Sequence, residues 1–373
     1  MAQEEKNCLF VKTGTKTGYN IYFETGFEQL AEVLQNECSI SERKICIVTD
    51  SNVNELYGEK VKKVLEGSCT ALSAFVFPAG EQNKTLDTVK ELYAYLIQNH
   101  FERKDLLIAL GGGVTGDLTG YAAATYLRGI DFVQIPTTLL AQVDSSIGGK
   151  TGVDFDGYKN MVGAFHQPCL VYTNLEVLST LTEEQFACGM GEVLKHGLIK
   201  NAAYYEWVIE HMSEINDREL NVLKEMVLES CKIKKAVVEK DPTEKGDRAL
   251  LNFGHTIGHA IEKVKAPDML HGQCVALGFV AAAYISYKRE LLSAEEFFEI
   301  RDMNIGFDLM FTVDGIDSEE ILNYTKSDKK MEGGKIRFVL LKKIGKAYID
   351  TEVTDAELLE AIDFINADKI EID

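Results

Sequence analysis

Residues 105–117 read Asp-Leu-Leu-Ile-Ala-Leu-Gly-Gly-Gly-Val-Thr-Gly-Asp, and residues 131–138 read Asp-Phe-Val-Gln-Ile-Pro-Thr-Thr. Each stretch is an apolar run that ends in small or hydroxylated residues, which predicts a strand followed by a loop. The first loop satisfies Gly-x-Gly-x-x-Gly and opens a helical pattern. Glycines let backbone amides approach a pyrophosphate, and the helix N-terminus adds free N–H donors. The alternative is a tight strand-to-helix turn that binds nothing.

The same alternation of strands and helices extends outward over the first half of the chain. Residues 8–23 predict a hairpin, and further strands are expected at 44–49, 72–77 and 170–174. Helices are expected at 27–36, 85–99 and 115–127. Strands separated by helices indicate βαβ units and a parallel sheet. We therefore expect an α/β Rossmann-like domain over residues 1–178 that binds a mononucleotide or a dinucleotide.

Long helical patterns replace this alternation after residue 178. One helix is expected to end near Lys200, and others are expected at 203–213, 217–240, 253–264, 271–292, 294–304, 318–327 and 355–367. Residues 335–348 are the β-like exception, as a possible hairpin that turns at Gly345. The second half is therefore predicted to be a mostly α-helical domain, residues 179–373.

Composition excludes several classes of protein. The chain has 373 residues and a net charge of −20, so it lacks the basic field that attracts nucleic acid. No apolar run reaches about 18 residues, so no membrane span is expected. The eight cysteines are scattered singly and no signal peptide is evident, which predicts free thiols in a cytoplasmic protein.

Three helical segments of the second half carry candidate metal ligands. Glu192 and Lys195 are spaced i, i+3, His255 and His259 are spaced i, i+4, and His271 begins a further helical pattern. Two histidines on one helical face can bind a single zinc ion. Spacing alone favours His255 and His259 with a third ligand from elsewhere. The alternative is one partly buried histidine and one surface histidine.

These motifs make the chain resemble the 3-dehydroquinate synthase family, within the sugar phosphate cyclase superfamily. The resemblance rests on Gly-Gly-Gly-Val-Thr-Gly-Asp, Val-Asp-Ser-Ser-Ile-Gly-Gly-Lys, Gly-Tyr-Lys-Asn and Leu-Asn-Phe-Gly-His-Thr-Ile-Gly-His. It covers nearly the whole chain, and the motifs occur in family order. It implies one zinc or cobalt ion per subunit, held by Glu192, His255 and His271. His259 is then a residue that faces the substrate, which disagrees with the argument from spacing.

The resemblance also implies the dinucleotide site. Asp50 and Asn52 are natural helix N-caps at a strand end, and the family makes them ribose or adenine contacts instead. Unlike the common dinucleotide fold, the glycine loop follows a later strand and no acid lies about 20 residues beyond it. The residues implied to bind NAD are Asp50, Asn52, Glu81, Lys84, Gly112, Gly113, Val114, Thr115, Gly116, Asp117, Thr137, Thr138, Lys150, Lys159, Leu178 and Thr180.

The activity implied is conversion of a seven-carbon sugar phosphate, 3-deoxy-D-arabino-heptulosonate 7-phosphate, to 3-dehydroquinate and phosphate in the shikimate pathway. The steps are transient NAD-dependent oxidation, phosphate elimination, reduction, ring opening and intramolecular aldol closure. Arg128 resembles a residue that reaches the phosphate from a neighbouring subunit, so a homodimer is expected. The residues implied to contact substrate or assist catalysis are Arg128, Asp144, Lys150, Asn160, Lys195, Lys234, Arg248, Asn252, His259, Lys329 and Lys330.

Two other readings of the same motifs stay open. Another sugar phosphate cyclase would keep the glycine loop and much of the metal site, and would differ around the substrate carboxylate and phosphate. A metal-dependent alcohol or glycerol dehydrogenase shares the βαβ half and the helical metal domain. It would lack Lys150 and the Lys159-Asn160 pair, and it would reduce NAD⁺ in net terms.

Overall fold

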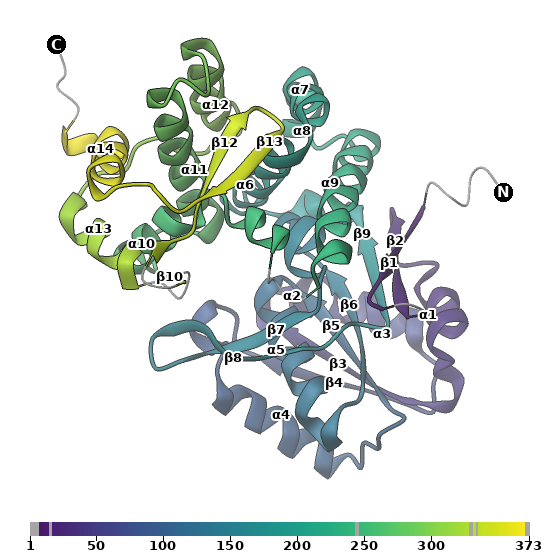
Figure 1. Ribbon diagram of the computed structural model, residues 1–373. Coiled ribbons are helices and arrows are strands. Elements are labelled where there is room, and N and C mark those ends of the chain that lie inside the picture. Colours follow the sequence, from purple (N-terminus) through teal and green to yellow (C-terminus); the bar gives the residue numbers. More distant parts are fainter. Residues whose placement is uncertain (1–6, 15–16, 243–245, 328–330, 333–334, 370–373) are drawn as a thin grey trace. The chain divides into compact units, whose positions relative to one another are not determined.

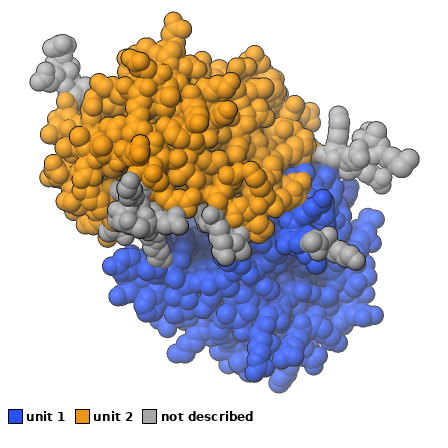
Figure 2. Space-filling model, viewed as in Figure 1, with its two compact units in different colours: residues 1–180 blue, residues 181–373 orange. Residues whose placement is uncertain are grey.

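The computed structural model describes the chain except for residues 1–6, 15–16, 243–245, 328–330, 333–334 and 370–373. The chain forms two compact units, residues 1–180 and 181–373, which are coloured separately in Figure 2. No helix in the described part of the chain is both long and apolar enough to cross a membrane.

Unit 1 is built on a seven-stranded sheet in the order β1-β2-β9-β6-β5-β3-β4 (Figure 1). The β1–β2 pair is antiparallel and the other neighbours are parallel, which confirms the predicted hairpin and parallel sheet. The strands are β1 (Cys8–Lys12), β2 (Gly18–Glu24), β3 (Lys44–Asp50), β4 (Ala71–Phe77), β5 (Leu106–Gly111), β6 (Asp131–Pro136) and β9 (Leu170–Asn174).

Both faces of the sheet are buried, which explains why its central strands read as continuous apolar runs. Ile45 and Ile47 of β3 lie in one core cluster, whereas Cys46 and Val48 lie in the other. The first cluster includes residues of α1 (Leu30–Cys38) and α3 (Glu59–Leu65), and the second includes residues of α4 (Leu86–Gln98) and α5 (Gly113–Thr125). Helices on both faces are the doubly wound arrangement expected of a nucleotide-binding domain.

Two local predictions in unit 1 need correction. The helix expected from residue 27 begins at Leu30, because Phe27 belongs to the core without being helical. Residues 150–165, for which no strand was predicted, form an antiparallel hairpin of β7 (Lys150–Phe155) and β8 (Tyr158–Phe165). Most of β8 is exposed, so it lacks the alternation of apolar and polar residues from which strands are recognised.

Unit 2 is helical, as expected, and its hairpin turns at Gly345 between β12 (Phe338–Lys343) and β13 (Lys346–Asp350). A short pair, β10 (Met331–Glu332) and β11 (Lys335–Ile336), precedes it. The main helices are α6 (Glu183–Lys200), α7 (Ala202–Glu210), α8 (Met212–Asn216), α9 (Leu220–Lys240), α10 (His255–Lys265), α11 (His271–Lys288), α12 (Ala294–Gly306), α13 (Ser318–Ser327) and α14 (Asp355–Ile365).

Helices α10 and α11 pack closely because glycines line their contact. A Cβ atom on Gly278 of α11 would lie 1.9 Å from the carbonyl oxygen of Gly254, and one on Gly258 would lie 2.8 Å from the carbonyl oxygen of Cys274. Any side chain at these positions would push the two helices apart. This close approach places the histidines of α10 beside His271, the first residue of α11.

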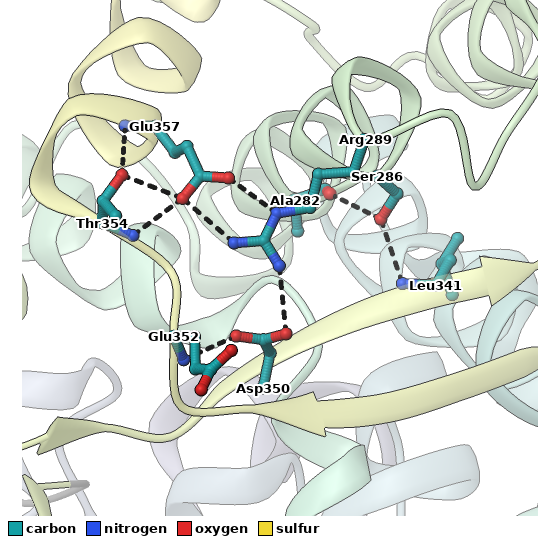
Figure 3. A network of polar contacts seen from close by, with 8 residues as sticks. All are labelled: Ala282, Ser286, Arg289, Leu341, Asp350, Glu352, Thr354 and Glu357. Atoms are coloured by element: carbon teal, nitrogen blue, oxygen red, sulfur yellow. Dashed lines mark hydrogen bonds and ion pairs between the residues drawn. The ribbon is translucent and has the colours of Figure 1, made fainter.

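The opposite end of α11 is held by Arg289, whose guanidinium bridges two carboxylates (Figure 3). Its Nε and Nη2 atoms donate to both oxygens of Glu357 at 2.6 and 3.0 Å, and Nη1 donates to Asp350 at 3.0 Å. Glu357 also lies in the capping box that begins α14 with Thr354. The guanidinium of Arg289 thus links α11 to the end of β13 and to the start of α14.

We expect Arg289→Met to lower the free energy of unfolding by about 1–3 kcal/mol, because two partly buried carboxylates lose a shared bidentate partner. The hydrogen bond from Arg289 lowers the pKa of Glu357 from 4.5 to about 2. A lowered folded-state pKa means that the stabilisation is present above pH 4.5 and is lost as the pH falls toward 2. Denaturant unfolding of both proteins at several pH values measures this, and their difference should shrink across that window.

Lys288→Met is the matched control, since Lys288 pairs with Glu360 while both side chains are half exposed. Such a surface ion pair contributes about 0–1 kcal/mol to the free energy of unfolding. An Arg289→Met protein as stable as the control would show that the bridge contributes nothing beyond a surface ion pair.

Candidate functional site

The carboxyl ends of the parallel strands in unit 1 carry the residues expected to bind the dinucleotide. Strand β3 ends at Asp50, and β5 runs beside it to Gly111. Asp50 Oδ1 accepts hydrogen bonds from the backbone N–H groups of Asn52 and Val53 at 2.9 and 3.0 Å, and Thr115 Oγ1 donates to Oδ2 at 3.3 Å. Asp50 is therefore a helix cap in this structure and also links β3 to the glycine loop.

The glycine loop joins β5 to α5, which begins at Gly113 with Gly112 as its N-cap. A Cβ atom on Gly112 would lie 3.0 Å from Thr138 Cγ2, so the loop packs tightly against the segment after β6. The backbone N–H of Thr137 donates to the carbonyl oxygen of Gly111 at 3.0 Å. The first turn of α5 therefore lies at the carboxyl ends of β5 and β6, where doubly wound sheets bind ligands, and its N–H groups are suited to an anion.

A buried cation, Lys84, connects this loop to the β7–β8 hairpin. Its side chain is 4% exposed, and Nζ lies 2.7 Å from Asp117 Oδ2 and 2.6 Å from Asn160 Oδ1. Burial opposes its charge, but the neighbouring carboxylates of Asp117 and Glu81 outweigh burial and raise the pKa of Lys84. Lys159 Nζ lies 3.7 Å from Glu81 Oε1. Five residues expected at the dinucleotide or substrate site thus form one polar cluster within unit 1.

Asp154 belongs to the same cluster and was not singled out from the sequence. Its Oδ1 accepts the backbone N–H of Asn160 at 2.7 Å, and its own N–H donates to the carbonyl oxygen of Lys84 at 2.8 Å. Asn160 has a left-handed φ of 52°, a conformation that costs energy unless its surroundings hold it. Asp154 therefore fixes the start of β8, which carries Lys159 and Asn160.

We expect Asp154→Ala to raise the KM for NAD⁺ about tenfold, because a hydrogen bond to a charged acceptor contributes about 1.5–3 kcal/mol. Asp154→Asn keeps an acceptor oxygen and should recover most of the loss. Initial-rate measurements over a range of NAD⁺ concentrations separate KM from kcat. Equal KM values in the alanine variant and the unaltered protein would contradict a positioning role.

The remaining candidates of unit 1 differ in their surroundings. Leu178 is fully buried, and Thr180 Oγ1 shares a 2.6 Å hydrogen bond with Tyr57 Oη. Asp144 lies in a helical turn, residues Ala141–Ser145, and Lys150 begins β7 with an exposed side chain. Arg128 is exposed on a left-handed turn with a φ of 70°.

Unit 2 brings together the histidines that the sequence separates. His255, His259 and His271 each offer a ring nitrogen, and these atoms all lie within 4.8 Å of one another. Glu192 of α6 joins them, since its Oε1 lies 3.7 Å from His255 Nε2. Imidazole and carboxylate donors at this spacing suit a divalent ion such as zinc. The arrangement accommodates both ligand sets considered from the sequence, with His259 or with Glu192 as a member.

Two acceptors orient the histidine rings. His255 Nδ1 lies 3.2 Å from the carbonyl oxygen of Phe253, and His271 Nδ1 lies 3.2 Å from Glu262 Oε2. A bond at Nδ1 places the proton there and leaves Nε2 as the ligand atom, which is how metal-binding histidines are commonly held. Glu262 was missed in the sequence, although its i+7 spacing from His255 places it on the same face of α10.

Three buried cations lie on packed elements of unit 2 that include α6, the helix of Glu192. Lys195 pairs with its Oε2 atom, and both side chains are 1% exposed. Lys234 of α9 and Arg248 of a helical turn, Asp247–Asn252, are buried as well, and α6, α9 and this turn pack on one another. Arg248 Nη1 donates to the carbonyl oxygen of Pro242 at 2.7 Å. Lysine and arginine side chains recognise carboxylates and phosphates, so a segment that gathers three of them is suited to an anionic ligand. Lys329 and Lys330 lie outside the described residues.

Comparison with known families gives matches along most of the chain. A family model described as 3-dehydroquinate synthase N-terminal matches residues 74–188, and one described as 3-dehydroquinate synthase C-terminal matches residues 189–331. A curated 3-dehydroquinate synthase from Acetivibrio thermocellus is 43% identical over 92% of this chain and 95% of that protein. A curated 3-dehydroquinate synthase from Ruminiclostridium cellulolyticum is 41% identical over 92% of this chain and 95% of that protein.

Solved structures with this fold include other cyclases. A 2-epi-5-epi-valiolone synthase from Streptomyces hygroscopicus subsp. jinggangensis, with NAD⁺ and Zn²⁺ bound, has a TM-score of 0.86 at 26% identity over 94% of this chain and 98% of its own. A 2-deoxy-scyllo-inosose synthase complexed with carbaglucose-6-phosphate, NAD⁺ and Co²⁺ has a TM-score of 0.86 at 25% identity over 95% and 99%. A glycerol dehydrogenase from Schizosaccharomyces pombe, at 14% identity over 92% and 88% with a TM-score of 0.64, shares the fold alone.

Proposed function

Because the chain belongs to the 3-dehydroquinate synthase family, we propose that it converts 3-deoxy-D-arabino-heptulosonate 7-phosphate to 3-dehydroquinate and phosphate. The net change is elimination of phosphate with ring formation, so the enzyme is a carbon–oxygen lyase. The observation that carries the proposal is the histidine cluster beside Glu192, on a chain that matches the family from residue 74 to 331. The cytoplasmic location expected from the sequence stays part of the proposal.

Unit 1 and unit 2 are proposed to hold different groups. Residues 1–178 bind NAD⁺ through the glycine loop and the cluster around Lys84, and residues 179–373 bind a divalent metal through Glu192, His255 and His271. When bound, NAD⁺ supplies a reversible oxidation and the metal supplies Lewis acidity toward substrate oxygens. Support comes from the donor chemistry of both sites and from the related cyclases that hold NAD⁺ with zinc or cobalt.

The chain's own residues bind and orient the anionic substrate. The buried cations Lys195, Lys234 and Arg248 would pair with its carboxylate or phosphate, and Asn252 would hold a hydroxyl. Asp144, Lys150 and Asn160 are proposed to contact the substrate from unit 1, and Lys329 or Lys330 to do so from outside the described residues. His259 is the candidate for proton transfer, because the family's set of metal ligands does not include it. The centroid of its ring lies 5.2 Å from that of His255 and 5.7 Å from that of His271, so it stands beside the proposed metal.

The two alternative functions receive less support. The valiolone and deoxy-inosose synthases are 25–26% identical to this chain, whereas the curated 3-dehydroquinate synthases reach 43%. The alcohol and glycerol dehydrogenases share the fold only, at 14–16% identity.

The test is to incubate the full chain with the seven-carbon sugar phosphate, zinc and a substoichiometric amount of NAD⁺. Phosphate release is followed together with absorbance at the NADH wavelength. We expect many phosphates per NAD⁺ with no lasting NADH, because the hydride returns within each turnover. Net NADH without phosphate would overturn the proposal in favour of a dehydrogenase. Neither signal, in a protein with metal and dinucleotide bound, would point to another sugar phosphate cyclase.

A functional homodimer is part of the same proposal. It is supported by the exposed position of Arg128 and by the large apolar side chains exposed on the β7–β8 hairpin, where Phe155, Tyr158 and Phe165 are each more than half exposed. Mixing tests it directly. If Arg128 acts in the partner's site, Lys195→Met and Arg128→Ala chains regain up to about a quarter of wild-type activity when refolded together. If Arg128→Ala is inactive alone and the mixture regains nothing, Arg128 acts in its own subunit's site; full activity of Arg128→Ala alone would place it outside any site.

A further inference from the structure

Two cysteines far apart in the sequence meet at the amino-terminal edge of the sheet in unit 1. Cys38 is the last residue of α1, and Cys169 directly precedes β9. Their Sγ atoms lie 3.5 Å apart although 131 residues separate them. Neither residue belongs to the proposed dinucleotide site, which lies at the carboxyl ends of the same strands.

The surroundings of the pair give the two thiols different pKa values. Cys169 Sγ also lies 3.1 Å from the carbonyl oxygen of Phe132. Arg43 and Asp131 form a 2.6 Å ion pair beside them, at the starts of β3 and β6. The hydrogen bond from Cys169 lowers the pKa of the Cys38 thiol, and the charge of Arg43 adds to this against the effect of burial. The pKa of Cys169 is raised, and burial also raises the pKa values of Cys8 and Cys69.

The geometry needs little adjustment for a disulfide. The sulfur atoms would have to approach by about 1.5 Å to reach the bond length of about 2.05 Å. Cys38 closes α1, and the left-handed residue Ser39 follows it, so the movement falls at a helix end rather than in its interior. The Cys38 residue is 3% exposed, which favours a small oxidant such as hydrogen peroxide over a bulky one.

We propose that Cys38 and Cys169 form a peroxide-sensitive dithiol, in which Cys38 is the nucleophile and Cys169 the resolving thiol. The Cys38 thiolate attacks one oxygen of hydrogen peroxide, the O–O bond breaks, and hydroxide leaves, which gives a sulfenic acid. Cys169 sulfur then attacks Cys38 sulfur, the S–O bond breaks, and the departing hydroxide takes the Cys169 proton as water. Two thiols are oxidised by two electrons, one peroxide is reduced, and two waters form after proton uptake.

The test uses the full chain in its folded state. The protein is treated with hydrogen peroxide, quenched with catalase, alkylated with N-ethylmaleimide, digested and examined by mass spectrometry. We expect a peptide pair linked through Cys38 and Cys169, two hydrogen atoms lighter than the separate peptides and split by dithiothreitol. Linkage should form at least about tenfold faster than oxidation of Cys8 or Cys69, and faster as the pH rises, because the thiolate is the reacting form.

Two variants test the assigned roles. Cys169→Ser should accumulate a sulfenic acid on Cys38 that dimedone traps, and Cys38→Ser should leave Cys169 unreacted while Cys8 and Cys69 are oxidised as before. The proposal is overturned if the folded wild-type chain shows no Cys38–Cys169 link when Cys8 or Cys69 is already oxidised. It is also overturned if the link appears only after the chain is unfolded. The wild-type measurement stands even if a variant fails to fold.

Discussion

Replacing Lys195 by methionine is expected to lower kcat/KM by about 10³-fold, the loss typical of removing a charged group that acts in the transition state. The same change should lower the free energy of unfolding of the metal-free protein by about 3–5 kcal/mol. Lys195 and Glu192 form an ion pair in which each side chain is 1% exposed. Methionine fills a similar volume and leaves the carboxylate of Glu192 buried without its cation. Activity assays and denaturant unfolding measure the two effects separately.

The double variant Lys195→Met with Glu192→Gln separates structure from function. Removing both charges should restore most of the lost stability, because a neutral buried pair needs no compensation, whereas activity should stay low. Lys232→Met is the matched control, since Lys232 and Glu229 form an i, i+3 pair on the surface of α9, with 48% and 35% exposed side chains. The Lys232→Met control should lower the free energy of unfolding by less than about 1 kcal/mol and leave activity unchanged. A Lys195→Met protein with normal kcat/KM would remove Lys195 from the proposed chemistry.

The strands and helices of this fold could be predicted wherever burial gives the apolar residues of the sequence a recognisable pattern. The central strands are covered on both faces, so β3, β5 and β6 read as apolar runs and were placed within a residue or two. The helices of unit 2 carry apolar residues at helical spacing and were found for the same reason. The β7–β8 hairpin was missed because β8 is mostly exposed and its residues resemble a loop.

The candidate site could be predicted only in part, because pairings across helices leave little trace in one sequence. Glycine positions indicated the loop before α5, and the i, i+4 histidines indicated a metal site. The roles of Glu262 and Asp154 depend on which atoms face each other after folding, and neither residue stands in a motif. The same holds for Cys38 and Cys169, whose separation in the sequence says nothing of their 3.5 Å contact.

Spacing makes His259 a metal ligand, whereas the family resemblance makes it a residue that faces the substrate. Comparing single histidine variants decides between the two. If Glu192, His255 and His271 are the ligands, His271→Ala should lose nearly all of about one bound metal ion per chain, because a catalytic site with three protein ligands cannot spare one. His259→Ala should keep its metal and lose activity. Metal content after dialysis, measured by plasma mass spectrometry, reports binding without depending on turnover.

Two further variants sharpen this comparison. Glu262→Gln should weaken metal binding by about 10–100-fold, because Glu262 lies 3.2 Å from His271 Nδ1 and fixes the ring that presents Nε2. His211→Ala is the control, since His211 stacks on Trp207 at the end of α7 and should leave metal content unchanged. If His259→Ala loses metal as completely as His271→Ala, the ligand set inferred from spacing is correct. Glu192 would then act mainly as the buried partner of Lys195, and the proton-transfer role would need another residue.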